Sequence, residues 1–136
     1  MKQYYPAIVA VIITVLVIIL YLNLFWERPN ENVKIRDIIS NPEMYIGKEV
    51  VLNGMYGGWG SYPQCDFERM GMVTRSDYII YDDTGCLYIC ASCEGVEYIF
   101  KEGDVNPSDK NTYGTKIKVK AFVGSVEGKP VLGKVS

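Results

Sequence analysis

The chain has 136 residues, a length that suits one domain, and its 14 Lys and Arg against 16 Asp and Glu give a net charge of -2. This balance supplies no basic field of the kind that points to nucleic acid. Histidine is absent, which excludes a histidine general base, a Cys-His or Ser-His catalytic pair, and a histidine ligand for zinc or haem. No catalytic residue and no cofactor are expected.

An apolar segment without a charged residue runs from Gln3 to Trp26. Residues 6–26 would span about 31 Å as a helix, close to the roughly 30 Å of a bilayer's hydrocarbon. Aromatic residues at both ends match the belts found at membrane interfaces. A signal peptide would have a shorter apolar run and a small-residue cleavage site, and a core helix would show a polar face. We therefore expect residues 1–26 to be a tail and a single-pass signal-anchor helix whose partner is the lipid bilayer.

The rest of the chain changes from helical to strand periodicity. Residues 27–33 are a polar linker, and residues 34–40 place isoleucines at helical spacing before Asn41-Pro42 ends the helix. A Gly-rich loop covers residues 57–63, and only weak structure is expected over residues 94–114. Strands are expected over residues 49–56, 76–81, 86–91, 115–123 and 130–135.

Two turns join strands into hairpins, Asp82-Asp83-Thr84-Gly85 and Glu127-Gly128. In the first turn the aspartates are expected to bind nearby backbone amides rather than to form a catalytic carboxylate pair. Five strands after a short helix suit a mainly β, closed barrel of the oligonucleotide/oligosaccharide-binding (OB) type over residues 34–136. Closure would also remove the edge strands of an open sheet.

Residues 35–54 and 74–89, with Gly58-Trp59 and Cys65 upstream of the second segment, carry a resemblance. They resemble membrane-anchored OB-fold proteins of unknown function, of archaeal type. The resemblance covers about residues 34–136 and implies a fold rather than an activity. The plan of one anchor plus an OB barrel is also similar to the haem chaperone of cytochrome c maturation. That family carries haem on a histidine, so its role does not transfer to a chain without histidine.

The four cysteines, Cys65, Cys86, Cys90 and Cys93, could form disulfides, hold zinc or remain buried thiols. Only Cys90 and Cys93 have the spacing of a zinc knuckle. Cys86 and Cys90 lie roughly 13 Å apart on one expected strand, too far for a shared metal or a direct bond. Because Cys65 lies on a loop that can approach the hairpin, we favour Cys65–Cys86 with Cys90–Cys93 as a local bridge, and no metal site.

The cysteines also bear on the side of the membrane. Lys2 on one flank and Arg28 on the other nearly balance the positive-inside rule, with a slight preference for a cytoplasmic C-terminal domain. Disulfides require an oxidising compartment, and on that ground we expect the domain outside the cell membrane. A redox role of Cys90 and Cys93 is less favoured, because Glu94 follows the motif and a negative neighbour raises a thiol pKa.

Pairing across the first turn predicts two faces of the hairpin. The core face would hold Tyr78, Ile80, Leu87 and Ile89. The outer face would hold Ile79, Tyr81, Cys86, Tyr88 and Cys90. OB barrels bind ligands on this outer side, so the candidate ligand face comprises Trp59, Tyr62, Tyr81 and Tyr88.

Bases could stack on these rings, yet residues 76–100 contain several acidic residues and no Lys or Arg, so the face would repel phosphate. The alternative is that the strand tyrosines are half-buried under loops.

Lys116, Lys118 and Lys120 alternate with core residues on one expected strand. This alternation is typical of a solvated lysine stripe that keeps a strand from aggregating. The stripe could also touch anionic lipid.

The sequence thus predicts a non-enzymatic, membrane-tethered binding module with a protein partner at the membrane surface and no small-molecule substrate. Binding of single-stranded nucleic acid is the alternative, and thiol-disulfide exchange is the second alternative.

Overall fold

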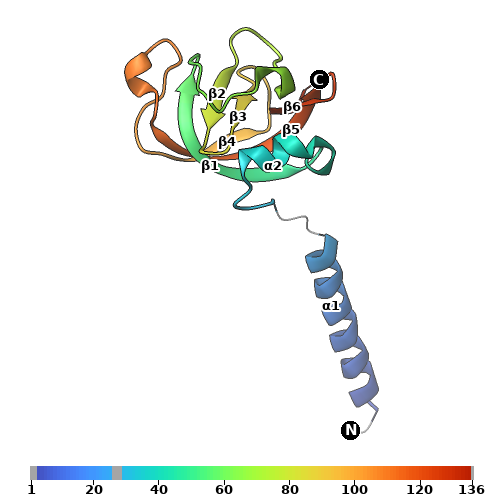
Figure 1. Ribbon diagram of the computed structural model, residues 1–136. Helices are drawn as coiled ribbons and strands as arrows, with labels where there is room; N and C mark the ends of the chain where they lie inside the picture. The colour runs from blue at the N-terminus through green and yellow to red at the C-terminus, as the bar shows by residue number, and fades with distance from the viewer. Residues whose placement is uncertain (1–2, 26–28, 136) are drawn as a thin grey trace.

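The computed structural model describes residues 3–25 and 29–135 and consists of one long helix and a β domain (Figure 1). The helices are α1 (Tyr5–Phe25) and α2 (Ile35–Ser40), with short 3-10 helices η1 (Pro42–Met44), η2 (Phe67–Arg69) and η3 (Lys110–Thr112). The strands are β1 (Glu49–Gly58), β2 (Tyr78–Tyr81), β3 (Cys86–Ile89), β4 (Val96–Lys101), β5 (Lys116–Val126) and β6 (Lys129–Leu132).

The helix α1 is long and apolar enough to cross a membrane, and its residues are exposed. Thr14 and Asn23 bind the helix's own backbone: Thr14 Oγ1 donates to the carbonyl of Ala10 at 2.9 Å, and Asn23 Nδ2 donates to that of Ile19 at 2.8 Å. Hydrogen bonds made within the helix suit an environment without water. The expected apolar helix is therefore present over nearly the predicted residues, with Trp26 outside the described ones.

Five strands close a barrel in the order β1-β2-β3-β6-β5, and β5 returns to β1. The pairs are antiparallel except β3 with β6, which run parallel. Closure depends on the length of β1, which pairs with β5 from Glu49 to Met55 and then with β2 up to Gly58. The expected mainly β barrel, preceded by a short helix, is confirmed.

The expectation of only weak structure over residues 94–114 is wrong, because a sixth strand, β4, lies there. It pairs antiparallel with β5, from Val96 opposite Ala121 to Lys101 opposite Ile117. The register shifts between Tyr98 and Phe100, which interrupts the two-residue alternation that would have marked the strand in the sequence. The β4 strand extends the barrel sheet past the end of β6.

The barrel interior is filled by aliphatic side chains from every barrel strand and from α2. Ile80, Leu87 and Ile89 are fully buried as predicted, and Tyr78 is half-buried against them. Ile35 and Ile38 of α2 are also fully buried, so the short helix closes one end of the barrel. Burying one such aliphatic side chain contributes roughly 1.5–3 kcal/mol, which outweighs the weak intrinsic stability of a six-residue helix.

The β2–β3 turn holds the start of α2 in place. Asp82 Oδ1 accepts from the backbone of Thr84 and Gly85, as expected of a turn residue, while its Oδ2 accepts from the amide of Ile35 at 3.1 Å. Thr84 Oγ1 accepts from the amide of Arg36 at 3.1 Å. The turn therefore caps the first amides of the helix, which have no partner within it.

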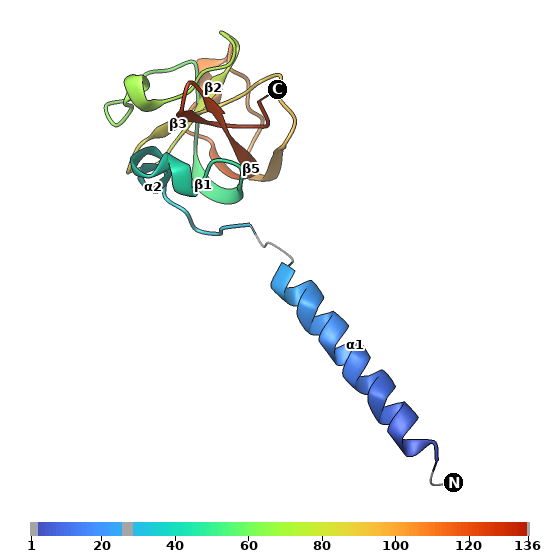
Figure 2. The same ribbon diagram turned by 90° about the vertical axis from the view of Figure 1, so that its right-hand side faces the viewer.

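The connection between α1 and the barrel is short. Asn30 pairs with β1: its amide donates to Glu49 at 3.1 Å and its carbonyl accepts from Val51 at 2.8 Å. The expected linker, residues 27–33, is therefore partly taken up by this pairing. Only residues 26–29 separate α1 from Asn30, a span of at most about 18 Å between Phe25 and Asn30. In both views α2 and the start of β1 lie at the end of the barrel nearest α1 (Figures 1 and 2).

Candidate functional site

The long segment between β1 and β2, residues 59–77, covers the outer face of the β2–β3 hairpin. The Cys65–Cys86 disulfide fixes it there, with Cα atoms 4.9 Å apart. Met70 from this segment is buried with Ile79 and Cys86 in a second, smaller hydrophobic cluster. The predicted pairing of Cys65 with Cys86 is confirmed, and the hairpin has a core on each of its two faces.

The four residues of the predicted ligand face lie in or beneath this segment. Tyr62 stacks on Tyr81 with ring centroids 4.1 Å apart, and Tyr88 lies beneath Phe67 at 6.3 Å. Both strand tyrosines are half-buried, as the alternative interpretation held. Trp59 is 52% exposed. The structure brings Tyr62 and Tyr81 together and uses them to pack the loop on the hairpin; a ligand on these residues stays a prediction.

Asp77 is the anchor of the covering segment, a role that the sequence analysis missed. Its side chain is buried, and Oδ2 accepts from the amides of Val73 at 2.7 Å and Thr74 at 3.1 Å. Oδ1 accepts from the hydroxyl of Thr74 at 2.8 Å and from the amide of Ala91 at 3.1 Å. This carboxylate therefore joins the end of the segment to the turn after β3, and its charge is not displayed on the surface.

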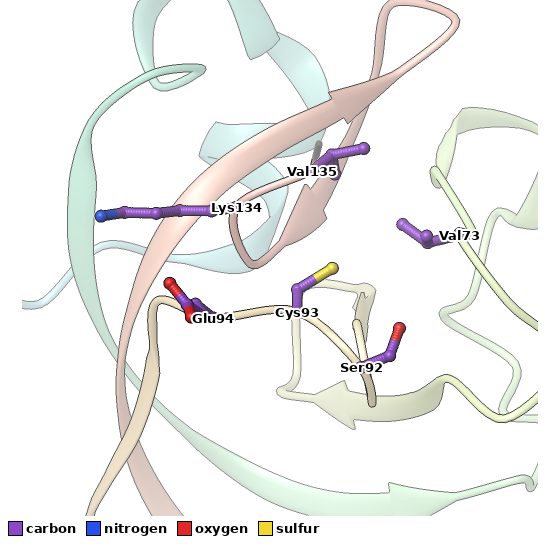
Figure 3. A pocket seen from close by; sticks show the side chains of 6 residues that line it. All are labelled: Val73, Ser92, Cys93, Glu94, Lys134 and Val135. Carbon is purple, nitrogen blue, oxygen red and sulfur yellow. The ribbon is translucent and has the colours of Figure 1, made fainter.

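The turn after β3 contains the second disulfide, Cys90–Cys93, with Cα atoms 5.4 Å apart. This predicted local bridge is confirmed, and all four cysteines are paired. Cys90 is 3% exposed, whereas Cys93 is half-buried at the edge of a cleft of about 360 Å³. Figure 3 shows the residues that line this cleft: Val73, Ser92, Cys93, Glu94, Lys134 and Val135.

The second surface feature is the outer edge of β4. Within residues 3–25 and 29–135, β4 pairs with β5 alone, so its other edge is open. Ile99 and Phe100 on this strand are 49% and 54% exposed. Phe100 also lines a groove of about 430 Å³ together with Met55 and Lys116. An open strand edge beside exposed apolar side chains is a surface that can pair with another chain.

A cluster of tyrosines packs within and against the barrel core beside β1. Tyr56 is buried, with its ring centroid 5.4 Å from that of Tyr78 and 6.1 Å from that of Tyr113. The Tyr98 hydroxyl donates to the Tyr78 hydroxyl at 2.9 Å. Burial raises the pKa of Tyr56 and Tyr98 well above the usual value near 10, and for Tyr98 the bond to Tyr78 adds to the effect.

We expect these tyrosines to make the stability of the barrel fall at alkaline pH. A phenol whose pKa is raised in the folded state stabilises the fold fully below pH about 10, and this stabilisation is lost as the pH rises above that value. The free energy of unfolding in urea should fall steeply from pH about 10 upward. The double variant Tyr56→Phe, Tyr98→Phe should show a shallower fall, and equal slopes for the two proteins would contradict the assignment.

Glycine at position 58 lets β1 pass close to this cluster. Its φ is +54°, and a Cβ at this position would clash with the Tyr113 ring. The Gly58 position thus needs both the absence of a side chain and a left-handed backbone.

No protein-family model, no curated protein and no solved structure matches this chain, so its function is inferred from its own residues and their geometry.

Proposed function

We propose that this chain is a membrane-tethered, OB-type binding module whose barrel lies outside the cytoplasm and binds an extended segment of a protein partner at the edge of β4. The observation that carries the proposal is the open edge of β4 with Ile99 and Phe100 exposed on it. At the β4 edge the module acts by binding rather than by catalysis.

The location is supported by the disulfides and by α1. Two disulfides in a 136-residue chain are typical of an oxidising compartment and rare in the cytosol. The exposed apolar surface of α1 needs a hydrocarbon environment, since a water-soluble protein would bury it. With only residues 26–29 between α1 and Asn30, the barrel would stay at the membrane surface.

A protein partner is supported by the chemistry of the edge. An extended peptide can add to an open strand through backbone hydrogen bonds, while neighbouring pockets take its side chains. On β4 the exposed Ile99 and Phe100 and the groove beside Phe100 supply the apolar contacts. The register shift and the charged Glu97 and Lys101 on the same strand would limit unspecific pairing.

Nucleic acid fits the same surfaces less well. The hairpin face on which bases would stack is covered by residues 59–77, and its strand tyrosines are half-buried. Residues 77–97 include several acidic side chains and no Lys or Arg. This segment therefore offers no positive charge to bind phosphate.

The tether is tested by fractionation and thiol alkylation in intact cells. The full chain should sediment with membranes and resist extraction at alkaline pH, and a chain beginning at Pro29 should be soluble and folded. A membrane-impermeant maleimide should label Cys65 and Cys86 in intact cells only after a reductant is added. Labelling that requires cell lysis would place the barrel in the cytoplasm and contradict the proposed location.

The partner site is tested by photo-crosslinking. A photoreactive amino acid in place of Ile99 should give a discrete protein adduct in native membranes. The matched control carries the same group in place of Lys129, an exposed residue of the β5–β6 hairpin. Adducts that nuclease removes, or equal adducts at both positions, would refute the β4 edge as a protein-binding site.

A further inference from the structure

We propose that Cys90–Cys93 is a thiol-disulfide exchange site, and that the sulfur of Cys93 is the atom that a partner's thiolate attacks. The proposal does not depend on the β4 edge, because the cleft beside Cys93 and the strand β4 share no residue. The partner class is a protein or peptide dithiol.

The first observation is the unequal access to the two sulfurs. Cys93 lines the cleft, and its sulfur points into the space between Val73 and Val135 (Figure 3). Cys90 is 3% exposed. A thiolate that enters the cleft can therefore reach the sulfur of Cys93, and Cys90 is then the leaving group. The other bridge also joins a buried cysteine, Cys86, to a half-buried one, Cys65. It differs in that Cys65 packs against the second hydrophobic cluster, whereas Cys93 lines the cleft.

The second observation is a hydroxyl beside the leaving sulfur. Ser92 Oγ lies 3.8 Å from Cys90 Sγ, within reach of a hydrogen bond to sulfur. When the bridge opens, this hydroxyl can donate to the Cys90 thiolate and stabilise it. Exchange is faster when the leaving thiolate is more stable, so the Ser92 hydroxyl promotes the exchange by stabilising the leaving sulfur of Cys90.

The exchange balances without any further reactant. The partner's thiolate forms a bond to Cys93 Sγ, the Cys90–Cys93 bond breaks, and its electron pair stays on Cys90 Sγ, which takes a proton from water. The partner's second thiolate then attacks its own first sulfur and releases Cys93 as a thiolate. The partner leaves oxidised by two electrons as a disulfide, and Cys90 and Cys93 remain as a reduced pair.

The two charged side chains that line the cleft, Glu94 and Lys134, do not face the attacked sulfur. In Figure 3 the charged ends of Glu94 and Lys134 lie on the other side of Cys93 from its sulfur, and Lys134 Nζ lies 5.7 Å from the ring centroid of Phe122. Glu94 would raise the pKa of a cysteine thiol of this chain and so disfavour its thiolate as the nucleophile. In the oxidised protein the attacking thiolate belongs to the partner. Its formation therefore does not depend on the pKa of a cysteine next to Glu94.

The exchange is tested on the oxidised full chain in detergent, using a reduced Cys-x-x-Cys peptide with valine neighbours as the probe. Samples are quenched by alkylation and mapped by mass spectrometry. Cys90 and Cys93 should become labelled at least about tenfold faster than Cys65 and Cys86. Equal rates for the two bridges, or earlier opening of Cys65–Cys86, would overturn the proposal.

The role of Ser92 has its own variants. Ser92→Ala should slow the opening of Cys90–Cys93 about fivefold, because the leaving thiolate of Cys90 loses one hydrogen bond. Ser92→Thr should restore the rate, and the exposed control Ser108→Ala should leave it unchanged. Unchanged melting temperatures would show that the fold is intact. If Ser92→Ala opened this bridge as fast as the parent does, the Ser92 hydroxyl would not stabilise Cys90 as the leaving sulfur, and the assignment would be overturned.

Discussion

Replacing Cys65 with serine should lower the melting temperature of the oxidised protein by roughly 12 °C. The Cys65–Cys86 bridge spans a sequence separation of 21, and closing a loop of this length stabilises by roughly 3 kcal/mol in the chain-entropy model. At about 4 °C per kcal/mol for a domain of this size, the loss is readily measured by calorimetry or circular dichroism. The variant also frees residues 59–77 to leave the hairpin, so the second hydrophobic cluster loses its support.

The controls separate this bridge from the other cysteines. The double variant Cys65→Ser, Cys86→Ser should melt close to the single variant, because either change removes the same bond. In a reductant strong enough to open both bridges, the parent and the variants should melt at nearly the same temperature. A variant that melts with the parent under oxidising conditions would show that the segment is held by packing alone.

Replacing Asp77 with alanine should destabilise the barrel by about 3 kcal/mol, because buried donors lose their acceptor. The amides of Val73, Thr74 and Ala91 all donate to this carboxylate. In the variant these three amides would have to find water or remain unpaired, and each unpaired buried donor costs about 1–3 kcal/mol. Urea unfolding of the full chain in detergent measures the effect.

The exposed Asp104 supplies the matched control. Asp104→Ala removes the same charge and should change the free energy of unfolding by less than about 0.5 kcal/mol. If the two variants were equally stable, the hydrogen bonds that the Asp77 carboxylate accepts would not stabilise the barrel. In Asp77→Ala the turn that carries Cys90 and Cys93 should also exchange its amide hydrogens faster, since Ala91 is no longer held.

Local patterns were sufficient to predict much of the barrel. The alternation in residues 115–123 requires one face of that strand to be buried, and a closed barrel is the arrangement that buries such faces without leaving edges. The aspartate turn fixes the register of the hairpin, so Ile80, Leu87 and Ile89 could be assigned to the core before the structure was known. Once that register is set, the spacing of Cys86 and Cys90 leaves Cys65 as a reachable partner.

The sequence by itself therefore determined the apolar helix, the hairpins and the core face, because each follows from the distances between neighbouring residues along a helix or strand. It favoured the two disulfides but left zinc and buried thiols as alternatives, because Cys65 lies on a loop whose path no local pattern fixes. Only the tertiary structure decided the rest. Strand β4 forms because the edge of β5 beyond β6 is free to pair, which no local pattern reveals. Asp77 and Ser92 acquire their roles in the same way: the first binds an amide of the turn after β3, 14 residues along the chain, and the second lies beside a sulfur whose burial depends on the closed barrel.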